Sequence, residues 1–145
     1  MSRPVRILVV EDNPADALLV EEALKEGRHT YDLHVAQDGV AALDYLRREG
    51  QFSSVKTPDL VLLDLNLPRM DGRALLEKVK RDPDLHEIPI IVLTTSSDQA
   101  DIARAYHLHA NCYLVKPLDF EGFWRTVRCI EDFWLTLVRL PRSMS

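Results

Sequence analysis

Short apolar runs alternate with amphipathic stretches along the whole chain, and this alternation restricts the possible folds more than any other feature. Each run holds four to six residues, and most are apolar on both faces. Strands of this kind are typical of a parallel sheet that helices cover on both sides. The five runs are Arg6 to Val10, Leu33 to Ala36, Leu60 to Leu63, Ile88 to Leu93 and Cys112 to Val115.

A helix signal follows each apolar run. Asn13 and Pro14 form an N-cap and a first-position proline, and Gly27 ends the helix that they begin. Four aspartates mark the starts of the other helices, and the last of these helices is long. These aspartates are Asp38, Asp71, Asp98 and Asp119.

Five such β/α repeats, joined by right-handed crossovers, predict an α/β fold. We expect a doubly wound, five-stranded parallel sheet with the flavodoxin-like order 2-1-3-4-5 and five helices. Residues 1–145 are expected to form a single domain, with a core over about residues 5–138 and a short C-terminal tail.

Acidic residues follow the two strands that this order places side by side. Glu11 and Asp12 come after the first run, and Asp64 comes after the third. Carboxylates about 4 Å apart repel by about 4 kcal/mol per pair at an effective dielectric near 20. A bound cation, a nearby ammonium or protonation of one acid would offset this repulsion. We favour Mg²⁺ held by Asp12 and Asp64, because it prefers hard oxygen ligands.

A hydroxyl and an ammonium are predicted at the same edge of the sheet. Thr94 and Thr95 end the fourth strand, and Lys116 and Pro117 end the fifth. An aspartate can attack a phosphoryl group to give an acyl phosphate when the phosphoryl charge is neutralised and in-line access is open. Asp64 therefore becomes the candidate phosphoryl acceptor, with Lys116 as counter-charge and Thr94 as donor.

Together these segments resemble, in order and spacing, the receiver domain of two-component response regulators. The resemblance covers about residues 5 to 138, nearly the whole chain, and it rests on the joint occurrence of the motifs. They are Val9-Val10-Glu11-Asp12-Asn13, Leu62-Leu63-Asp64 with Pro68 and Met70-Asp71-Gly72 after it, Leu93-Thr94-Thr95, and Lys116-Pro117.

The resemblance implies a role for each matching residue. Asp64 would be the phosphoacceptor, Thr94 the hydroxyl that moves toward the phosphoryl group and Lys116 its counter-charge. The metal site would comprise Glu11, Asp12, Asp64 and the backbone carbonyl of Asn66. Tyr113 would turn inward on phosphorylation, although the residues alone also allow a core aromatic with its hydroxyl at the surface. Asn66 and Ser96 would influence the phosphoryl lifetime, and the bond before Pro117 would be cis.

The segment from Ala110 to Pro117, followed by Phe133-Trp134-Leu135, is similar to stand-alone receivers that partner phytochrome-type sensor kinases. The resemblance implies a single-domain response regulator that accepts a phosphoryl group from a histidine kinase. It would signal through the face formed by the fourth helix, fifth strand and fifth helix, without a DNA-binding output domain. It would not be an enzyme, beyond slow self-dephosphorylation.

The composition of the chain indicates its cellular compartment and the kinds of partner that it can bind. Its 18 Lys and Arg residues are scattered among 23 Asp and Glu residues, which argues against nucleic-acid binding. The N-terminal apolar run is too short for a signal peptide or a membrane span. Cys112 and Cys129 lack metal-ligand spacing, so we expect buried, reduced cysteines in a cytoplasmic protein.

The predicted last helix carries more apolar residues than one sheet can cover. One stripe would pack on the sheet, and it comprises Phe123, Val127, Ile130, Trp134 and Leu137. Further apolar residues lie off this stripe, namely Phe133, Leu135, Val138 and Leu140. An exposed apolar patch marks an interface, so we predict a homodimer built on this helix and its extension.

Two alternatives and one unexplained segment remain. A haloacid dehalogenase-type phosphotransferase also uses a strand-end aspartate, but it carries a second Asp two residues later, where this chain has Asn66. A pseudo-receiver would keep the fold without the chemistry, and the set of Asp12, Asp64, Thr94 and Lys116 argues against it. The connection over residues 48–57 is long, and it is expected either to be mobile or to serve a partner.

Overall fold

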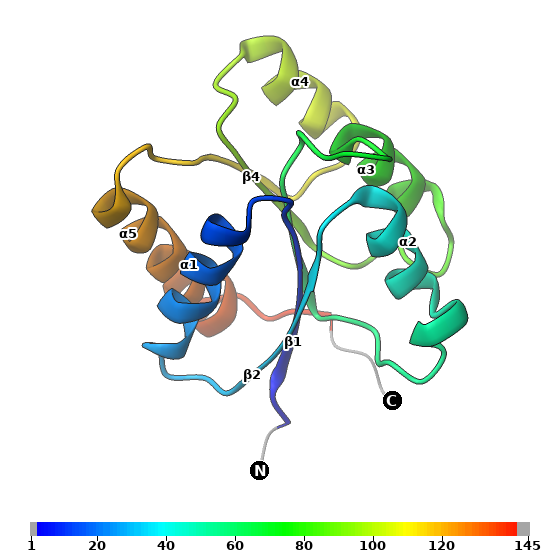
Figure 1. Cartoon of the computed structure of the whole chain (residues 1–145), viewed down its shortest axis with the longest axis horizontal. Helices are drawn as coiled ribbons and strands as arrows, with labels where there is room; N and C mark the ends of the chain where they lie inside the picture. The colour runs from blue at the N-terminus through cyan, green and yellow to red at the C-terminus, as the bar shows by residue number, and fades with distance from the viewer. Residues whose placement is uncertain (1–2, 142–145) are drawn as a thin grey trace.

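Five parallel strands form one sheet in the predicted order β2-β1-β3-β4-β5. The computed structural model describes residues 3–141. Figure 1 shows the sheet between two layers of helices, with the carboxyl ends of the strands toward the top of the view. The strands are β1 (Val5–Val10), β2 (Tyr31–Ala36), β3 (Leu60–Leu63), β4 (Ile90–Thr94) and β5 (Cys112–Val115).

Helices cover both faces of this sheet, as the apolar strands require (Figure 1). Helices α1 and α5 pack on one face, and α2, α3 and α4 lie on the other. All four residues of β3 and all five of β4 are buried, because these central strands have helices on both sides. The helices are α1 (Pro14–Lys25), α2 (Gly39–Arg47), α3 (Gly72–Arg81), α4 (Gln99–His107) and α5 (Phe120–Ile130).

Each helix begins at the capping residue that the sequence predicts. The Asn13 side chain accepts hydrogen bonds from the backbone N–H groups of Ala15 and Asp16, and Pro14 occupies the first helical position. The aspartate caps of the other four helices each accept one backbone N–H in the first turn. A cap of this type is worth about 1 kcal/mol, so these side chains fix where the helices start.

Strand β4 begins at Ile90, two residues later than the sequence predicts. Pro89 has no N–H to give to the ladder, and the N–H of Ile88 instead donates to the carbonyl of Leu85 in the preceding turn. The carbonyl of Pro89 accepts from Val61, so pairing with β3 starts there. The turn therefore sets the strand boundary.

The last helix is long, as predicted, but its apolar stripe changes direction. After Ile130 the chain continues as a π-helical segment, η2 (Glu131–Leu137). A π-helix has more residues per turn than an α-helix, so the next buried apolar residue after Ile130 is Leu135. The prediction that Leu137 packs on the sheet is wrong, since its side chain is 74% exposed.

A buried glutamate joins this π-helical segment to the start of β2. Glu131 is fully buried and accepts hydrogen bonds from the Tyr31 hydroxyl, the Arg128 guanidinium and the backbone N–H of Arg28. A Cβ on Gly27 would collide with the Glu131 carboxylate, so glycine is needed for this close approach. The network fixes the C-terminal segment against the α1–β2 loop.

The connection over residues 48–57 packs on the domain through an aromatic cluster. The rings of His34 and Tyr45 stack with centroids 4.3 Å apart. Phe52, in a short 3-10 turn, η1 (Gly50–Phe52), meets both rings edge-on. These contacts attach the middle of the connection to β2 and α2.

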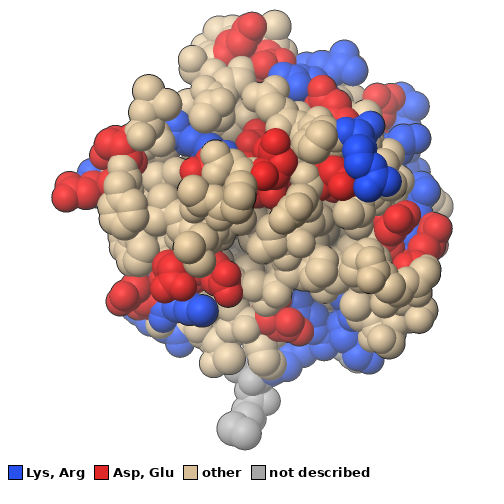
Figure 2. Space-filling view, in the orientation of Figure 1, with Lys and Arg blue, Asp and Glu red and all other residues tan. Residues whose placement is uncertain are grey.

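Both cysteines are free, but only Cys112 is partly covered. The prediction that both are buried is wrong for Cys129, which lies on the outward side of α5, away from Val127 and Ile130. Over residues 3–141 the structure has no helix long and apolar enough to cross a membrane. On the face in Figure 2, acidic and neutral side chains interrupt the Lys and Arg side chains.

Candidate functional site

The carboxyl ends of β1 and β3 bring three acidic side chains together. One carboxylate oxygen from each of Glu11, Asp12 and Asp64 lies within 4.8 Å of the others. Glu11 and Asp64 are buried, whereas Asp12 is exposed. Adjacent parallel strands place residues 11, 12 and 64 at one edge, because Val10 of β1 pairs with Leu63 of β3.

Thr94, the last residue of β4, supplies a hydroxyl to this cluster. Its Oγ1 donates a hydrogen bond to Asp64 Oδ1 at 2.7 Å. The backbone N–H of Asn66 donates to the same oxygen at 3.2 Å. Thr94 is fully buried, so its hydroxyl is held in this direction.

Lys116, the first residue after β5, places its ammonium among the acids. Its Nζ donates to Asp64 Oδ2 at 3.0 Å, to Asp16 Oδ2 at 2.9 Å and to Glu11 Oε1. Burial alone would lower the pKa of Lys116, but the hydrogen bonds that its ammonium donates to Glu11 and Asp16 outweigh the effect of burial and raise the pKa. The ammonium therefore keeps its charge.

The expected cis bond between Lys116 and Pro117 is wrong for this structure. Residues 3–141 contain no cis peptide bond. The trans form is the favoured isomer before proline by about 0.5–1 kcal/mol. The direction of the Lys116 side chain is accounted for by its carboxylate partners.

The two buried acids respond differently to their surroundings. Burial would raise the pKa of Asp64, but the hydrogen bond from Thr94 and the charge of Lys116 lower it below its usual range. Burial raises the pKa of Glu11 to about 7 despite its contact with Lys116. Asp64 is thus an ionised carboxylate at neutral pH, and Glu11 is the acid that takes up a proton first.

The acid cluster fits a divalent cation. Its donors are carboxylate oxygens from Glu11, Asp12 and Asp64, and they are close enough to share one ion. Hard oxygen donors suit Mg²⁺ and similar cations. One ammonium does not balance the negative charge of the cluster, and a cation would supply the remainder.

A second network starts from the loop after β4. The Tyr113 hydroxyl donates to the backbone carbonyl of Ser96 at 2.9 Å. Ser96 Oγ donates to Asp101 at 2.7 Å, and Arg73 on α3 forms an ion pair with Asp101 at 2.9 Å. Tyr113 and Ser96 are therefore connected to each other and to the start of α4.

Asp16 is not among the site residues predicted from the sequence, although its carboxylate contacts the Lys116 ammonium in the structure. Asp16 lies in the first turn of α1, where an acid is ordinarily explained by the helix dipole. The signal that could have identified it is its place four residues after Asp12, one helical turn above the end of β1. Asp71 caps α3, as the sequence predicts, and its carboxylate also pairs with Arg73.

Known proteins match nearly the whole length of this chain. The chain matches the response regulator receiver domain family over residues 7–128. Response regulator Rcp1 of Synechocystis sp. is 45% identical over 140 residues, which cover 97% of this chain and 95% of Rcp1. The probable methanogenesis regulatory protein FilR2 of Methanothrix harundinacea is 48% identical over 139 residues, covering 95% of this chain and 88% of FilR2.

Solved structures agree with this assignment. The Mn²⁺-bound form of Rcp1 aligns with a TM-score of 0.93, covering 96% of this chain and all of that one. The phosphorylated cyanobacterial phytochrome response regulator RcpA aligns with a TM-score of 0.94 at 43% identity, covering 97% of this chain and all of that one. The chain belongs to the response regulator receiver domain family.

Proposed function

We propose that Asp64 accepts a phosphoryl group from a sensor histidine kinase in a Mg²⁺-dependent reaction. The observation that carries this proposal is the setting of Asp64. Its carboxylate is buried and ionised, Thr94 and Lys116 each contact one of its oxygens, and two more acids lie beside it. A helix cap or solvated acid needs none of these neighbours.

The proposed step forms one bond and breaks one. An oxygen lone pair of Asp64 attacks the phosphorus of a phosphohistidine, and the P–N bond breaks as the new P–O bond forms. The electron pair of the P–N bond stays on the imidazole nitrogen, which takes up a proton. In the product, Lys116 and Thr94 would donate hydrogen bonds to the phosphoryl oxygens.

Glu11, Asp12 and Asp64, with the backbone carbonyl of Asn66, would hold the Mg²⁺ ion. Bound there, the ion neutralises negative charge on the phosphoryl oxygens. The Mn²⁺-bound form of the relative Rcp1 supports a divalent cation at this site. Asn66 and Ser96, each two residues beyond a site residue, would influence the phosphoryl lifetime.

The added phosphoryl charge would be transmitted through Thr94 and Tyr113. Thr94 would move its hydroxyl from Asp64 to a phosphoryl oxygen, which changes the loop that carries Ser96. Tyr113 donates to the Ser96 carbonyl, so its position depends on this loop. The response would therefore reach the face formed by α4, β5 and α5, where a partner protein would read it.

The relatives indicate the kind of kinase. RcpA is a phytochrome response regulator, and we infer that this chain also serves a phytochrome-type kinase. We place the exchange in the cytoplasm and assign the chain no turnover beyond slow self-dephosphorylation. Family membership removes the ground for the haloacid dehalogenase alternative.

Incubation with a small acyl phosphate and Mg²⁺ tests the proposal. We expect a mass gain of one phosphoryl group in the parent and in Asp71→Asn, a matched acid on the same loop that caps α3 and pairs with Arg73. Asp64→Asn should show no gain, and chelation of Mg²⁺ should suppress the gain in the parent. An equal gain in Asp64→Asn would refute the acceptor, and no gain in the parent would favour the pseudo-receiver. Release of many equivalents of phosphate would indicate an enzyme.

We further propose that two copies associate through α5 and its π-helical extension, with β5 and α4 contributing at the margin of the interface. Phe133 and Leu137 are 54% and 74% exposed on the extension. Val115, at the end of β5, and Tyr106, on α4, are also exposed, so apolar surface continues onto both neighbouring elements.

Sedimentation of the parent beside Leu137→Asp tests the homodimer. We expect a dimeric parent and a monomeric variant, because a charge in a two-fold apolar interface is buried twice. Leu118→Asp is the control, since Leu118 is 97% exposed in the loop before α5, at the end of the helix away from the extension. A monomeric parent would end this proposal.

A further inference from the structure

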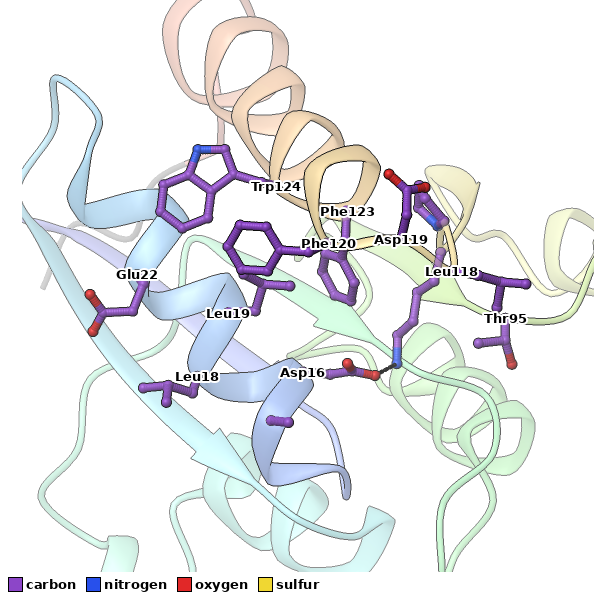
Figure 3. Close-up of a pocket in the computed structure, with 13 residues that line it drawn as sticks. Asp16, Leu18, Leu19, Glu22, Thr95, Leu118, Asp119, Phe120, Phe123 and Trp124 are labelled. Atoms are coloured by element: carbon purple, nitrogen blue, oxygen red, sulfur yellow. Dashed lines mark hydrogen bonds and ion pairs between the residues drawn. The ribbon is translucent and has the colours of Figure 1, made fainter.

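Asp16 gives Lys116 a partner that stands outside the acid cluster. Its Oδ2 accepts a hydrogen bond from Lys116 Nζ at 2.9 Å, the interaction drawn as a dashed line in Figure 3. The Lys116 side chain is 4% exposed and that of Asp16 is 28% exposed. The cluster comprises Glu11, Asp12 and Asp64, and Asp16 is not among its members.

Asp16 also closes one end of an apolar groove. The groove lies between α1 and α5 and has a volume of about 700 Å³. Figure 3 shows Leu19 on α1 facing Phe120 and Trp124 on α5, with Asp16 at the end nearest Lys116. The centroid of the Phe123 ring, which also lines the groove, lies 6.0 Å from Lys116 Nζ. The Asp16 carboxylate is therefore the polar group that holds Lys116 on its groove side.

The other two acidic partners of Lys116, Glu11 and Asp64, are also candidate metal ligands. Glu11 and Asp64 belong to the candidate cation site, so a bound cation would coordinate the same carboxylates that accept hydrogen bonds from the Lys116 ammonium. A phosphoryl group on Asp64 would likewise occupy an oxygen of that carboxylate. Lys116 contacts three acids in this structure, Glu11, Asp16 and Asp64. With Glu11 and Asp64 engaged, Asp16 would be the one of the three that is left to bind the ammonium.

We propose that Asp16 is a positioning residue that keeps the Lys116 ammonium at the site when Glu11 and Asp64 are engaged by a cation or a phosphoryl group. This proposal rests on the proposed function, in which Lys116 neutralises phosphoryl charge. Asp16 would act through Lys116 and would not touch the phosphoryl group. A first-turn acid that only complements the helix dipole would leave Lys116 unaffected.

The side-chain ammonium of Lys116 can be followed directly by NMR with ¹⁵N-labelled lysine, using Lys116→Arg to assign its signal. In the parent we expect a hydrogen-bonded, slowly exchanging ammonium that persists when Mg²⁺ saturates the protein. In Asp16→Asn we expect its exchange with water to accelerate about tenfold on adding Mg²⁺, the factor for one lost charge-assisted hydrogen bond. Asp16→Glu should restore protection.

Glu22→Gln is the matched control. Glu22 also lies on α1 and lines the groove, but its ion-pair partner is Lys25, so its removal changes the same charge without touching Lys116. The rate of phosphoryl gain from a small acyl phosphate should fall about tenfold in Asp16→Asn and stay within about twofold of the parent in Glu22→Gln. Thermal unfolding of each variant verifies that it is folded.

Several outcomes would overturn the proposal. Protection of Lys116 in Mg²⁺-saturated Asp16→Asn equal to the parent would do so, as would loss of protection in the Mg²⁺-saturated parent. Equal effects of Asp16→Asn and Glu22→Gln would show a general charge effect. If the parent gains no phosphoryl group, the proposed function fails, whereas the NMR comparison still decides whether Asp16 retains Lys116.

Discussion

Asp64 is a carboxylate at the end of a strand whose four residues are all buried and apolar. Such a position is costly for a charge unless hydrogen bonds and an opposite charge compensate for lost hydration. Thr94, Lys116 and the Asn66 N–H provide that compensation. The site therefore holds an ionised carboxylate in a direction fixed by its neighbours.

Replacing Thr94 tests this balance. Thr94→Val keeps the shape of the side chain but removes the donor to Asp64 Oδ1. We expect the pKa of Asp64 to rise and the free energy of unfolding at pH 7 to fall by about 1–2 kcal/mol. Carboxyl ¹³C NMR and urea unfolding measure the two effects. Thr94→Ser keeps the hydroxyl and should resemble the parent, and an unchanged pKa in Thr94→Val would contradict the account.

At the scale of single residues, the site residues at strand ends could be predicted from the sequence, but not every contact that they make. Glu11, Asp64, Thr94 and Lys116 could be placed because each directly follows or ends a strand. The spacing of Asp16 from Asp12 is not sufficient to predict its contact with Lys116, because that contact depends on how far the Lys116 side chain reaches across the sheet. The outward position of Cys129 and the trans bond before Pro117 likewise follow from three-dimensional packing and isomer choice, which a local sequence pattern does not specify.

At the scale of elements, the π-helical segment depends on Glu131. Burial would raise the pKa of this carboxyl, but hydrogen bonds from Tyr31 and Arg128 lower it below the ordinary value of 4.5. A depressed folded-state pKa contributes stability above the unfolded pKa, and this contribution is lost as the pH falls through the folded value. The charge of Glu131 thus stabilises the segment at neutral pH.

Glu131→Gln should lower the free energy of unfolding by about 2 kcal/mol at pH 7, because Gln loses the charge-assisted bonds. The difference from the parent should shrink as the pH falls below about 4. Urea unfolding at pH 7 and at pH 3.5 measures both values. Glu121→Gln, an exposed change on α5, is the control, and a difference independent of pH would refute the role of the charge.

The ion pair between Arg73 and Asp101 joins two more elements, α3 and α4. Arg73→Gln should free the start of α4, so we expect amide hydrogen exchange in residues 99–107 to accelerate about threefold. Arg81→Gln, which removes an ion pair with Glu77 within α3, should leave α4 unchanged. Equal exchange in the parent and Arg73→Gln would show that the pair does not restrain α4.

Element positions were predictable where a local signal fixes them. The five caps each satisfy backbone groups within one helical turn, so their sequence signature is sufficient. The π-helical segment was not predictable from the apolar spacing. A backbone hydrogen bond from Val138 to the Phe133 carbonyl accompanies the shift of the buried apolar position to Leu135. Two of the partners of Glu131, Arg28 and Tyr31, lie about 100 residues away along the chain.

At the scale of the molecule, strand order makes the site. The order β2-β1-β3-β4-β5 places β1 and β3 together, so acids separated by more than 50 residues in the sequence share one edge. Alternating strands and helices were sufficient to predict this order, because crossover handedness leaves few topologies. The same edge receives Thr94 from β4 and Lys116 from the loop after β5.

The central claim is that Asp64 carries the phosphoryl group. After incubation with a small acyl phosphate and Mg²⁺, borohydride reduction converts an aspartyl phosphate to homoserine, and peptide mass spectrometry locates the converted residue. The account predicts conversion at residue 64 alone, and none when Mg²⁺ is chelated. Conversion at Glu11, Asp12 or another acid, or no conversion in the presence of Mg²⁺, would contradict it.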